Sequence, residues 1–231
     1  MSDAYIDTYS ALDARMKIVD VITNNLANAN TAGFKRDFGF ILQNETGFGA
    51  ATKVDLAPGD LVPTGNPLDV AINGPGFFAI ETSNGVRYTR SGNFGVNAAG
   101  ELVNKDSLKV LSTSGSPIVV GEGQVEIRDG GVVTVDGNEV GTLQIVNFAN
   151  PAMLMKEGLS RFAWNGAASG VQNLSDPSVK GGYLERSNVN AIDEMVHLMS
   201  AYREFEAVQR TLKTLMTDMN SKLIQELGKL S

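Results

Sequence analysis

The chain has 231 residues, of which 42% are hydrophobic, enough to bury a core and to exclude wholesale disorder. Its formal net charge of −7 argues against nucleic acid or an anionic membrane surface as the main partner. The chain contains no cysteine, which excludes disulfides, thiolate nucleophiles and thiolate metal sites.

The first ten residues, MSDAYIDTYS, have neither the basic segment nor the apolar run of a secretory signal peptide. No window approaches the roughly 18 uninterrupted apolar residues of a membrane span. On these two grounds alone, we expect a soluble cytoplasmic protein without membrane insertion.

Glycine and proline are distributed unevenly along the chain. All prolines lie between Pro58 and Pro177, and no glycine occurs before Gly33 or between Gly182 and Gly228. Because glycine and proline interrupt helices and form turns, this distribution predicts helical ends and a non-helical middle.

Apolar residues in the N-terminal segment recur in alternate steps of four and three, which is typical of one face of a heptad-repeat helix. The series is Tyr5, Tyr9, Leu12, Met16, Val19, Thr23 and Leu26. A row of asparagines interrupts it at its end, with four of them between Asn24 and Asn30.

The C-terminal segment has a second heptad series, which consists of Leu198, Tyr202, Phe205, Val208, Leu212, Leu215 and Met219. It predicts a helix over 190–229, about 60 Å long at 1.5 Å per residue. Ser187 or Asn188 is expected to cap its start. Isolated helices are marginal in water, so the two helices are expected to pair as a coiled coil. Some apolar residues fall partly outside the two seams and indicate further helices alongside, which other copies of the chain could supply. They are Ile6, Ile18, Val21, Val196 and Leu198.

The middle of the chain shows the pattern of an antiparallel β domain. The runs Phe77–Thr82 and Val86–Arg90 flank Asn84-Gly85, a strong hairpin signal. Further short strands are predicted near Leu102 and Val110 and over 118–120, 125–127, 132–135 and 143–148, with turns at Gly130-Gly131 and Asp136-Gly137. Many short strands with glycine turns favour a sandwich or barrel-like domain.

No residue pattern predicts an enzyme. The only histidine, His197, has no second histidine or cysteine with which to form a zinc site or a catalytic triad. The acidic pairs Asp193-Glu194 and Glu204-Glu206 are expected on the solvated face of a helix. The stretch INGPGFF lacks the spacing of a dinucleotide-binding loop. We therefore expect no catalytic, cofactor-binding or metal site and no cofactor, and an interaction surface on the helices.

Three blocks of the sequence resemble signatures of the flagellar axial proteins, the family of rod and hook subunits. They are NNLANANTAGFKRD (24–37), NPLDVAINGPGFFAIETSNGVRYTRSGNFGVNAAGELV (66–103) and GYLERSNVNAIDEMVHLMSAYREFEAVQRTLKT (182–214). Within the family, the second block and the compact length of the chain most resemble those of the proximal-rod member of the basal-body rod. The distal rod protein or a hook-type subunit is the alternative. Two other classes stay open: a secreted carbohydrate-active β domain with helical oligomerisation arms, and a secreted scaffold unrelated to motility.

The resemblance implies an α+β fold in which both ends of the chain form a helical inner domain and the β domain faces outward. The expected divisions are an N-terminal helix (1–37), an extended connector (38–65), the β domain (66–165), a second connector (166–183) and the C-terminal helix (184–231). The implied partners are further copies, other rod subunits and the flagellar export apparatus, with no nucleic acid. Export by this route needs no cleaved signal peptide, so the implied location is the periplasmic rod of the flagellar basal body. The pair Phe38 and Leu42 fits the spacing of the family's export motif.

The asparagines suggest a hypothesis about register. An amide buried without partners is costly, so buried asparagines would be satisfied in only one alignment of the helices. The predicted assembly interface comprises Leu12, Met16, Val19, Asn24, Asn25, Leu26, Asn28, Asn30, Leu198, Tyr202, Phe205, Leu212, Leu215 and Met219. Asn30 and Gly33 are expected to supply the left-handed backbone that ends the first helix.

Overall fold

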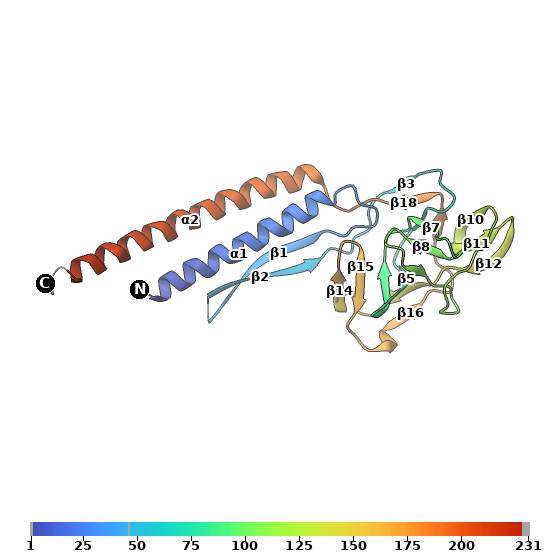
Figure 1. Cartoon of the computed structure of the whole chain (residues 1–231), viewed down its shortest axis with the longest axis horizontal. Coiled ribbons are helices and arrows are strands. Elements are labelled where there is room, and N and C mark those ends of the chain that lie inside the picture. The colour runs from blue at the N-terminus through green and yellow to red at the C-terminus, as the bar shows by residue number, and fades with distance from the viewer. Residues whose placement is uncertain (1, 46, 228–231) are drawn as a thin grey trace. The chain divides into compact units, whose positions relative to one another are not determined.

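The computed structural model describes residues 2–45 and 47–227 and divides the chain into two compact units (Figure 1). The helical unit comprises Met1–Ala27, Arg36–Asp55 and Val189–Ser231. The β unit comprises Asn28–Lys35 and Leu56–Asn188. Helices at the two ends and an antiparallel β region between them make the chain an α+β protein, as predicted.

The helical unit contains α1 (Ser2–Ala27), the hairpin of β1 (Asp37–Asn44) and β2 (Gly47–Val54), and α2 (Ala191–Leu227). Helix α1 packs against α2 on one side and against both hairpin strands on another. Figure 1 shows α1 as the middle layer between α2 and the hairpin. The last two residues of the helix predicted over 190–229 lie outside the described part of the chain.

The start of α2 is capped by Asn190, and the prediction of Ser187 or Asn188 as the cap was wrong. The Asn190 side-chain oxygen accepts hydrogen bonds from the backbone N–H groups of Ile192, at 3.0 Å, and Asp193, at 3.5 Å. An N-cap side chain bonds to the second and third helical residues, so Asn190 fits this role where Ser187 and Asn188, further upstream, do not.

The first predicted connector, 38–65, is not simply extended. Its first part pairs with itself as β1 and β2, in register from Asp37 opposite Val54 to Asn44 opposite Gly47. The prediction failed because the run FGFILQNETGFGAATK lacks regular alternation of apolar and polar residues. Packing against α1 stabilises the hairpin, since an isolated two-stranded hairpin is marginal in water.

The β unit is built from short strands distributed over 61–185. They are β3 (Leu61–Pro63), β4 (Val70–Ile72), β5 (Phe77–Thr82), β6 (Gly85–Thr89), β7 (Phe94–Val96), β8 (Leu102–Asn104), β9 (Lys109–Val110), β10 (Val125–Ile127), β11 (Val132–Val135), β12 (Asn138–Thr142), β13 (Ile145–Phe148), β14 (Leu154–Glu157), β15 (Arg161–Trp164), β16 (Val171–Asn173), β17 (Val179–Gly181) and β18 (Tyr183–Glu185). The largest sheet has the order β14-β15-β6-β5-β9-β8-β7, with β13 joined to β5 and to β16. A smaller sheet has the order β10-β11-β12, and β17 pairs with β4 and β18 with β3.

The second predicted connector, 166–183, also contains paired strands. Strand β16 pairs with β13, and β17 pairs with β4. These strands are only three residues long, and pairing partners far away in the sequence determine them, so local sequence patterns do not reveal them.

Two glycine turns show how the hairpins close. The predicted hairpin at Asn84-Gly85 is confirmed, but of these two residues only Gly85 has a positive φ, and Thr82 lies opposite Gly85. At Asp136-Gly137 both residues have positive φ, 50° and 84°, as a type I′ turn requires. The core that these strands enclose is aliphatic and aromatic, with Phe78, Ile80 and Leu102 fully buried.

Candidate assembly surfaces

The face of α2 toward α1 is a heptad stripe. The buried or half-buried positions of α2 from its first turn onward are Glu194, Leu198, Ala201, Phe205, Val208, Leu212, Leu215 and Met219. These positions alternate in steps of four and three, as the sequence predicted, with one difference in the residues. Ala201 occupies the stripe where Tyr202 was expected, and Tyr202 is 49% exposed on the outer side.

The predicted stripe of α1 is only partly correct. Leu12, Val19 and Leu26 are buried or half-buried on the same side of the helix as Arg15, whose guanidinium pairs with Glu204 of α2 at 3.1 Å. Tyr9 and Met16, which were predicted in this stripe, are instead exposed. The difference arises because α1 has two buried sides, and the side toward the hairpin was not anticipated.

The second buried side of α1 faces β1 and β2. A Cβ atom added at Gly39 of β1 would lie 2.7 Å from Ile18, and Ser10 accepts a hydrogen bond from the Phe48 backbone N–H at 3.0 Å. Ile18 and Val21, which fall outside the predicted seam, are therefore covered by this chain's own hairpin rather than by another helix.

The asparagines divide into two buried and two exposed residues. Asn25 is buried and binds the Asp37 backbone twice: its amide donates to the Asp37 carbonyl at 2.8 Å, and its side-chain oxygen accepts from the Asp37 N–H at 2.9 Å. Asn28 is buried and accepts a hydrogen bond from the Thr31 hydroxyl at 3.1 Å. Asn24 and Asn30 are exposed. Asn25 therefore aligns α1 with the hairpin of its own chain.

The left-handed residue after α1 is Gly33 alone, with φ of 68°, and the prediction for Asn30 was wrong. Gly33 donates its N–H to the Glu185 carbonyl at 2.8 Å, and an added Cβ would lie 2.3 Å from the Ser91 nitrogen. A side chain therefore does not fit at Gly33, and its backbone lies directly against the β unit.

Arg36 connects the start of the hairpin to the first turns of α2. Its guanidinium pairs with the buried carboxylate of Glu194 at 2.5 Å, contacts Nδ1 of His197 at 3.2 Å and lies 4.4 Å from the centre of the Phe38 ring. Glu194, predicted on a solvated face, is 1% exposed because it meets this cation. His197 is exposed on the helix surface.

A buried ionic cluster that the sequence analysis missed lies in the β unit. Lys35 Nζ contacts Oε1 of Glu185 at 2.5 Å, and Arg90 contacts Oε2 of the same carboxylate at 3.3 Å. Lys35 also donates to the Ala57 carbonyl at 2.7 Å. Burial lowers the pKa of Arg90, and the negative charge of Glu185 partly opposes this. The three charged residues come from the three signature blocks, one from each, where they end the sequences GFK, YTR and YLE. A charged residue next to apolar residues in each block is the sequence feature that could have predicted the cluster.

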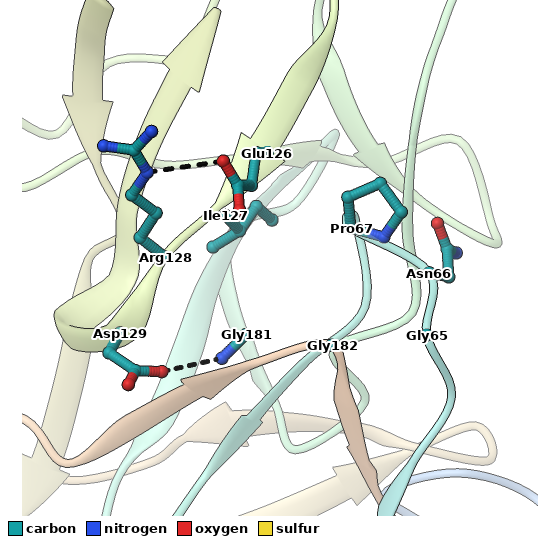
Figure 2. Close-up of a pocket in the computed structure, with 9 residues that line it drawn as sticks. All are labelled: Gly65, Asn66, Pro67, Glu126, Ile127, Arg128, Asp129, Gly181 and Gly182. Carbon is teal, nitrogen blue, oxygen red and sulfur yellow. Dashed lines mark hydrogen bonds and ion pairs between the residues drawn. The ribbon is translucent and has the colours of Figure 1, made fainter. Parts of the chain in front are cut away.

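A groove of the β unit, of about 570 Å³, offers no evident chemistry (Figure 2). Its charged residues already engage one another or the backbone: Glu126 pairs with Arg128 at 3.3 Å, and Asp129 accepts from the Gly181 N–H at 3.2 Å. Across the described chain, no group of three or more histidine, cysteine or acidic residues could hold a metal ion. Neither helix, over its described residues, is long and apolar enough to cross a membrane.

Two groups of exposed apolar residues lie on the outer layers of the helical unit. On the outer side of β1, Phe38, Phe40 and Leu42 alternate along the strand and are exposed; we call them the hairpin face. On the outer side of α2, Ile192, Met195, Val196, Met199 and Tyr202 are exposed; we call them the α2 stripe. The predicted export pair, Phe38 and Leu42, belongs to the hairpin face.

Comparison with known proteins identifies three matching family models. A model described as flagellar basal body rod protein matches residues 9–35, one described as flagellar hook protein FlgE/F/G D1 domain matches 71–144, and one described as flagellar basal body rod FlgEFG protein C-terminal matches 180–226. These ranges lie in α1 and the residues after it, in the β unit, and in β18 with α2.

Individual relatives align over nearly the whole chain. The flagellar basal-body rod protein FlgG of Agrobacterium fabrum is 35% identical, over 89% of this chain and 92% of its own length. The flagellar basal-body rod protein FlgF of Mesorhizobium japonicum is 34% identical, over 86% of this chain and 88% of its own length. FlgF of Caulobacter vibrioides is 29% identical, over 96% of this chain and 98% of its own length.

Proposed function

Because the chain belongs to the family of flagellar basal-body rod proteins, we propose that it is a subunit that self-assembles into the rod and transmits motor torque. A head-to-tail contact that does not close into a ring produces a helical filament. In such an array, load is shared along many parallel helices, and neither turnover nor a cofactor is needed. The partners in this proposal are further copies and other rod subunits.

The observation that carries the proposal is the concentration of exposed large apolar side chains in the helical unit. The β unit encloses its own core, with Phe78 and Phe162 fully buried, and its most exposed large apolar side chains are Val119, Met155 and Leu159. The helical unit leaves large apolar side chains exposed on both outer layers and on α1, where Ile6, Tyr9 and Met16 are more than half exposed. Extensive apolar patches of this kind mark interaction sites.

We further propose that α1 and α2 pair as a coiled coil and form the inner domain of the rod, with the β unit facing outward. The heptad spacing of the half-buried positions of α2 supports this. The predicted interface residues fall into two groups in this proposal. Those of the stripe, such as Phe205 and Leu212, hold the helix pair together, and the exposed ones, which are Met16, Asn24, Asn30 and Tyr202, contact neighbouring copies.

The proposal includes export through the flagellar export apparatus without a cleaved signal peptide, to the periplasmic part of the basal body. The exposure of Phe38 and Leu42 supports their accessibility to that apparatus.

The rod position that we propose is the proximal one, and the distal position is the alternative. Relatives named FlgF and FlgG align with the chain about equally well.

The test is the location of the chain in the cell. Basal bodies purified from a motile strain should contain it, and deletion of its gene should abolish swimming and arrest assembly at the rod. A deletion strain that swims normally and builds complete basal bodies would contradict the proposal. A Glu126→Gln variant, altered in the groove of the β unit, should restore motility, because the proposal assigns the groove no assembly contact.

A further inference from the structure

The hairpin face and the α2 stripe lie on opposite outer layers of the helical unit, with α1 between them (Figure 1). We infer that the hairpin face of one copy packs against the α2 stripe of the next copy. This inference rests on the proposed function and names the contact through which the copies associate.

The two surfaces match in length. Phe38, Phe40 and Leu42 occupy alternate positions of β1 and span about 13 Å at 3.3 Å per residue. The stripe from Ile192 to Tyr202 spans about 15 Å at 1.5 Å per residue. Beyond Tyr202 the same side of α2 becomes polar, with Arg203, Glu206 and Arg210. The apolar stripe therefore ends where the hairpin face would end.

The two surfaces also match in shape. In the hairpin, Phe40 lies opposite Ala51 and Leu42 lies opposite Gly49. Directly opposed residues share one face of the pair, so large side chains on β1 stand beside small ones on β2. This produces a ridge with a shallow floor, against which a helix can lie. The ridge is aromatic and the stripe contains Met195 and Met199, and methionine sulfur makes favourable contacts with aromatic rings.

Charge sets the orientation of the contact. Lys53 lies opposite Phe38 at one end of the hairpin face, and Asp193 is exposed beside Ile192 at the start of the stripe. Pairing of Lys53 with Asp193 places Phe38 near Ile192 and Leu42 near Tyr202. Because the two patches differ, the contact is head-to-tail and leaves one free patch at each end of the array.

The absence of cysteine from the chain allows a clean cross-linking test. A chain carrying Phe40→Cys and Met199→Cys replaces the natural one in the cell, and basal bodies are purified and oxidised. The control carries Phe40→Cys and Thr217→Cys, since Thr217 is exposed five turns further along the same side of α2. A ladder of multiples of this chain is expected from the first pair and none from the control. Phe40 is outside the predicted export pair, so export should proceed.

Four results would overturn the inference. The first is the absence of a ladder although the chain is present in the basal bodies, and the second is cross-linking by Phe40→Cys alone. The third is equal cross-linking in the control, and the fourth is cross-linking to a different protein, identified by mass spectrometry. Absence of the natural chain from basal bodies would overturn the proposed function as well, so the two failures are distinguishable. The pair Ala51→Cys and Val196→Cys, which keeps the aromatic ridge intact, repeats the test if Phe40→Cys impairs folding.

Discussion

Asn25 shows how one polar side chain aligns two elements. It binds both the N–H and the carbonyl of Asp37, as a neighbouring β-strand would, and it is almost fully buried. Its amide is satisfied only when α1 and the hairpin have this one alignment. Asn25 therefore aligns a helix with a hairpin of the same chain, and a role for the asparagines in register against α2 or between copies stays a prediction.

Asn25→Ala should cost about 1–3 kcal/mol of local stability, because the Asp37 N–H and carbonyl lose their partners. The expected result is faster hydrogen exchange at the Asp37 amide, measured by mass spectrometry or NMR. Asn30→Ala, at an exposed position, is the control and should leave that amide unchanged. Equal protection in both variants would show that the Asn25 hydrogen bonds do not hold the hairpin.

Glu185 is the residue on which the ionic cluster of the β unit depends, because its carboxylate pairs with two buried cations, Lys35 and Arg90. Glu185→Gln removes the negative charge with which both cations pair and should destabilise the β unit by about 3–5 kcal/mol, the usual cost of breaking a buried ion pair. The urea midpoint of the β-sheet signal is the measurement. Glu157→Gln breaks the exposed pair with Arg87 and should shift the midpoint far less, because exposed ion pairs contribute little to stability. Similar midpoints for the two variants would contradict the structural role of the cluster.

At the scale of elements, α1 has two packing sides and α2 has one. A heptad count cannot distinguish Tyr9 and Met16 from Thr8 and Arg15, since either set completes a series with Leu12 and Val19. Apolar character favoured the first set. In the structure Thr8 and Arg15 lie on the side of α1 that faces α2, because the neighbouring side packs against β1 and β2.

The difference between the inner and outer sides of α2 can be tested with one pair of aromatic residues. Phe205→Ala removes a ring from the half-buried stripe, whereas Tyr202→Ala removes an exposed one. Phe205→Ala should lower the melting temperature of the helical circular dichroism signal, with a cost of about 1–3 kcal/mol for a partly buried ring. Tyr202→Ala should stay within about 0.5 kcal/mol of the natural chain. The order would reverse if Tyr202 rather than Phe205 packed against α1.

At the scale of the whole molecule, the chain passes between the two units more than once. Residues 28–35 belong to the β unit although 36–55 belong to the helical unit. Phe34 and Lys35 are fully buried, and Lys156 donates to the Lys35 carbonyl at 2.7 Å. The β unit is therefore held together partly by a segment that directly follows α1.

Limited proteolysis of the dilute monomer should therefore yield a resistant core larger than residues 66–165. If the helical unit opens first, cleavage in 36–55 should leave a peptide containing residues 28–35 bound to the core that continues from Leu56. Native mass spectrometry should detect this peptide, and Glu185→Gln should release it. A core that retains no such peptide in the natural chain would show that the buried cluster does not hold residues 28–35.

Local patterns in the sequence determined the helical ends, the β middle, the Asn84-Gly85 hairpin and the heptad stripe of α2. They did so because glycine, proline and apolar spacing act over a few residues. Tertiary structure alone decided the β1–β2 hairpin, the side of α1 that faces α2, the partner of Asn25 and the Lys35–Glu185–Arg90 cluster. Local patterns do not show these four features because each depends on packing between elements. The hairpin and the orientation of α1 depend on each other, and the free-energy cost of burying Asn25 or Lys35 is offset only where a partner from another segment is present.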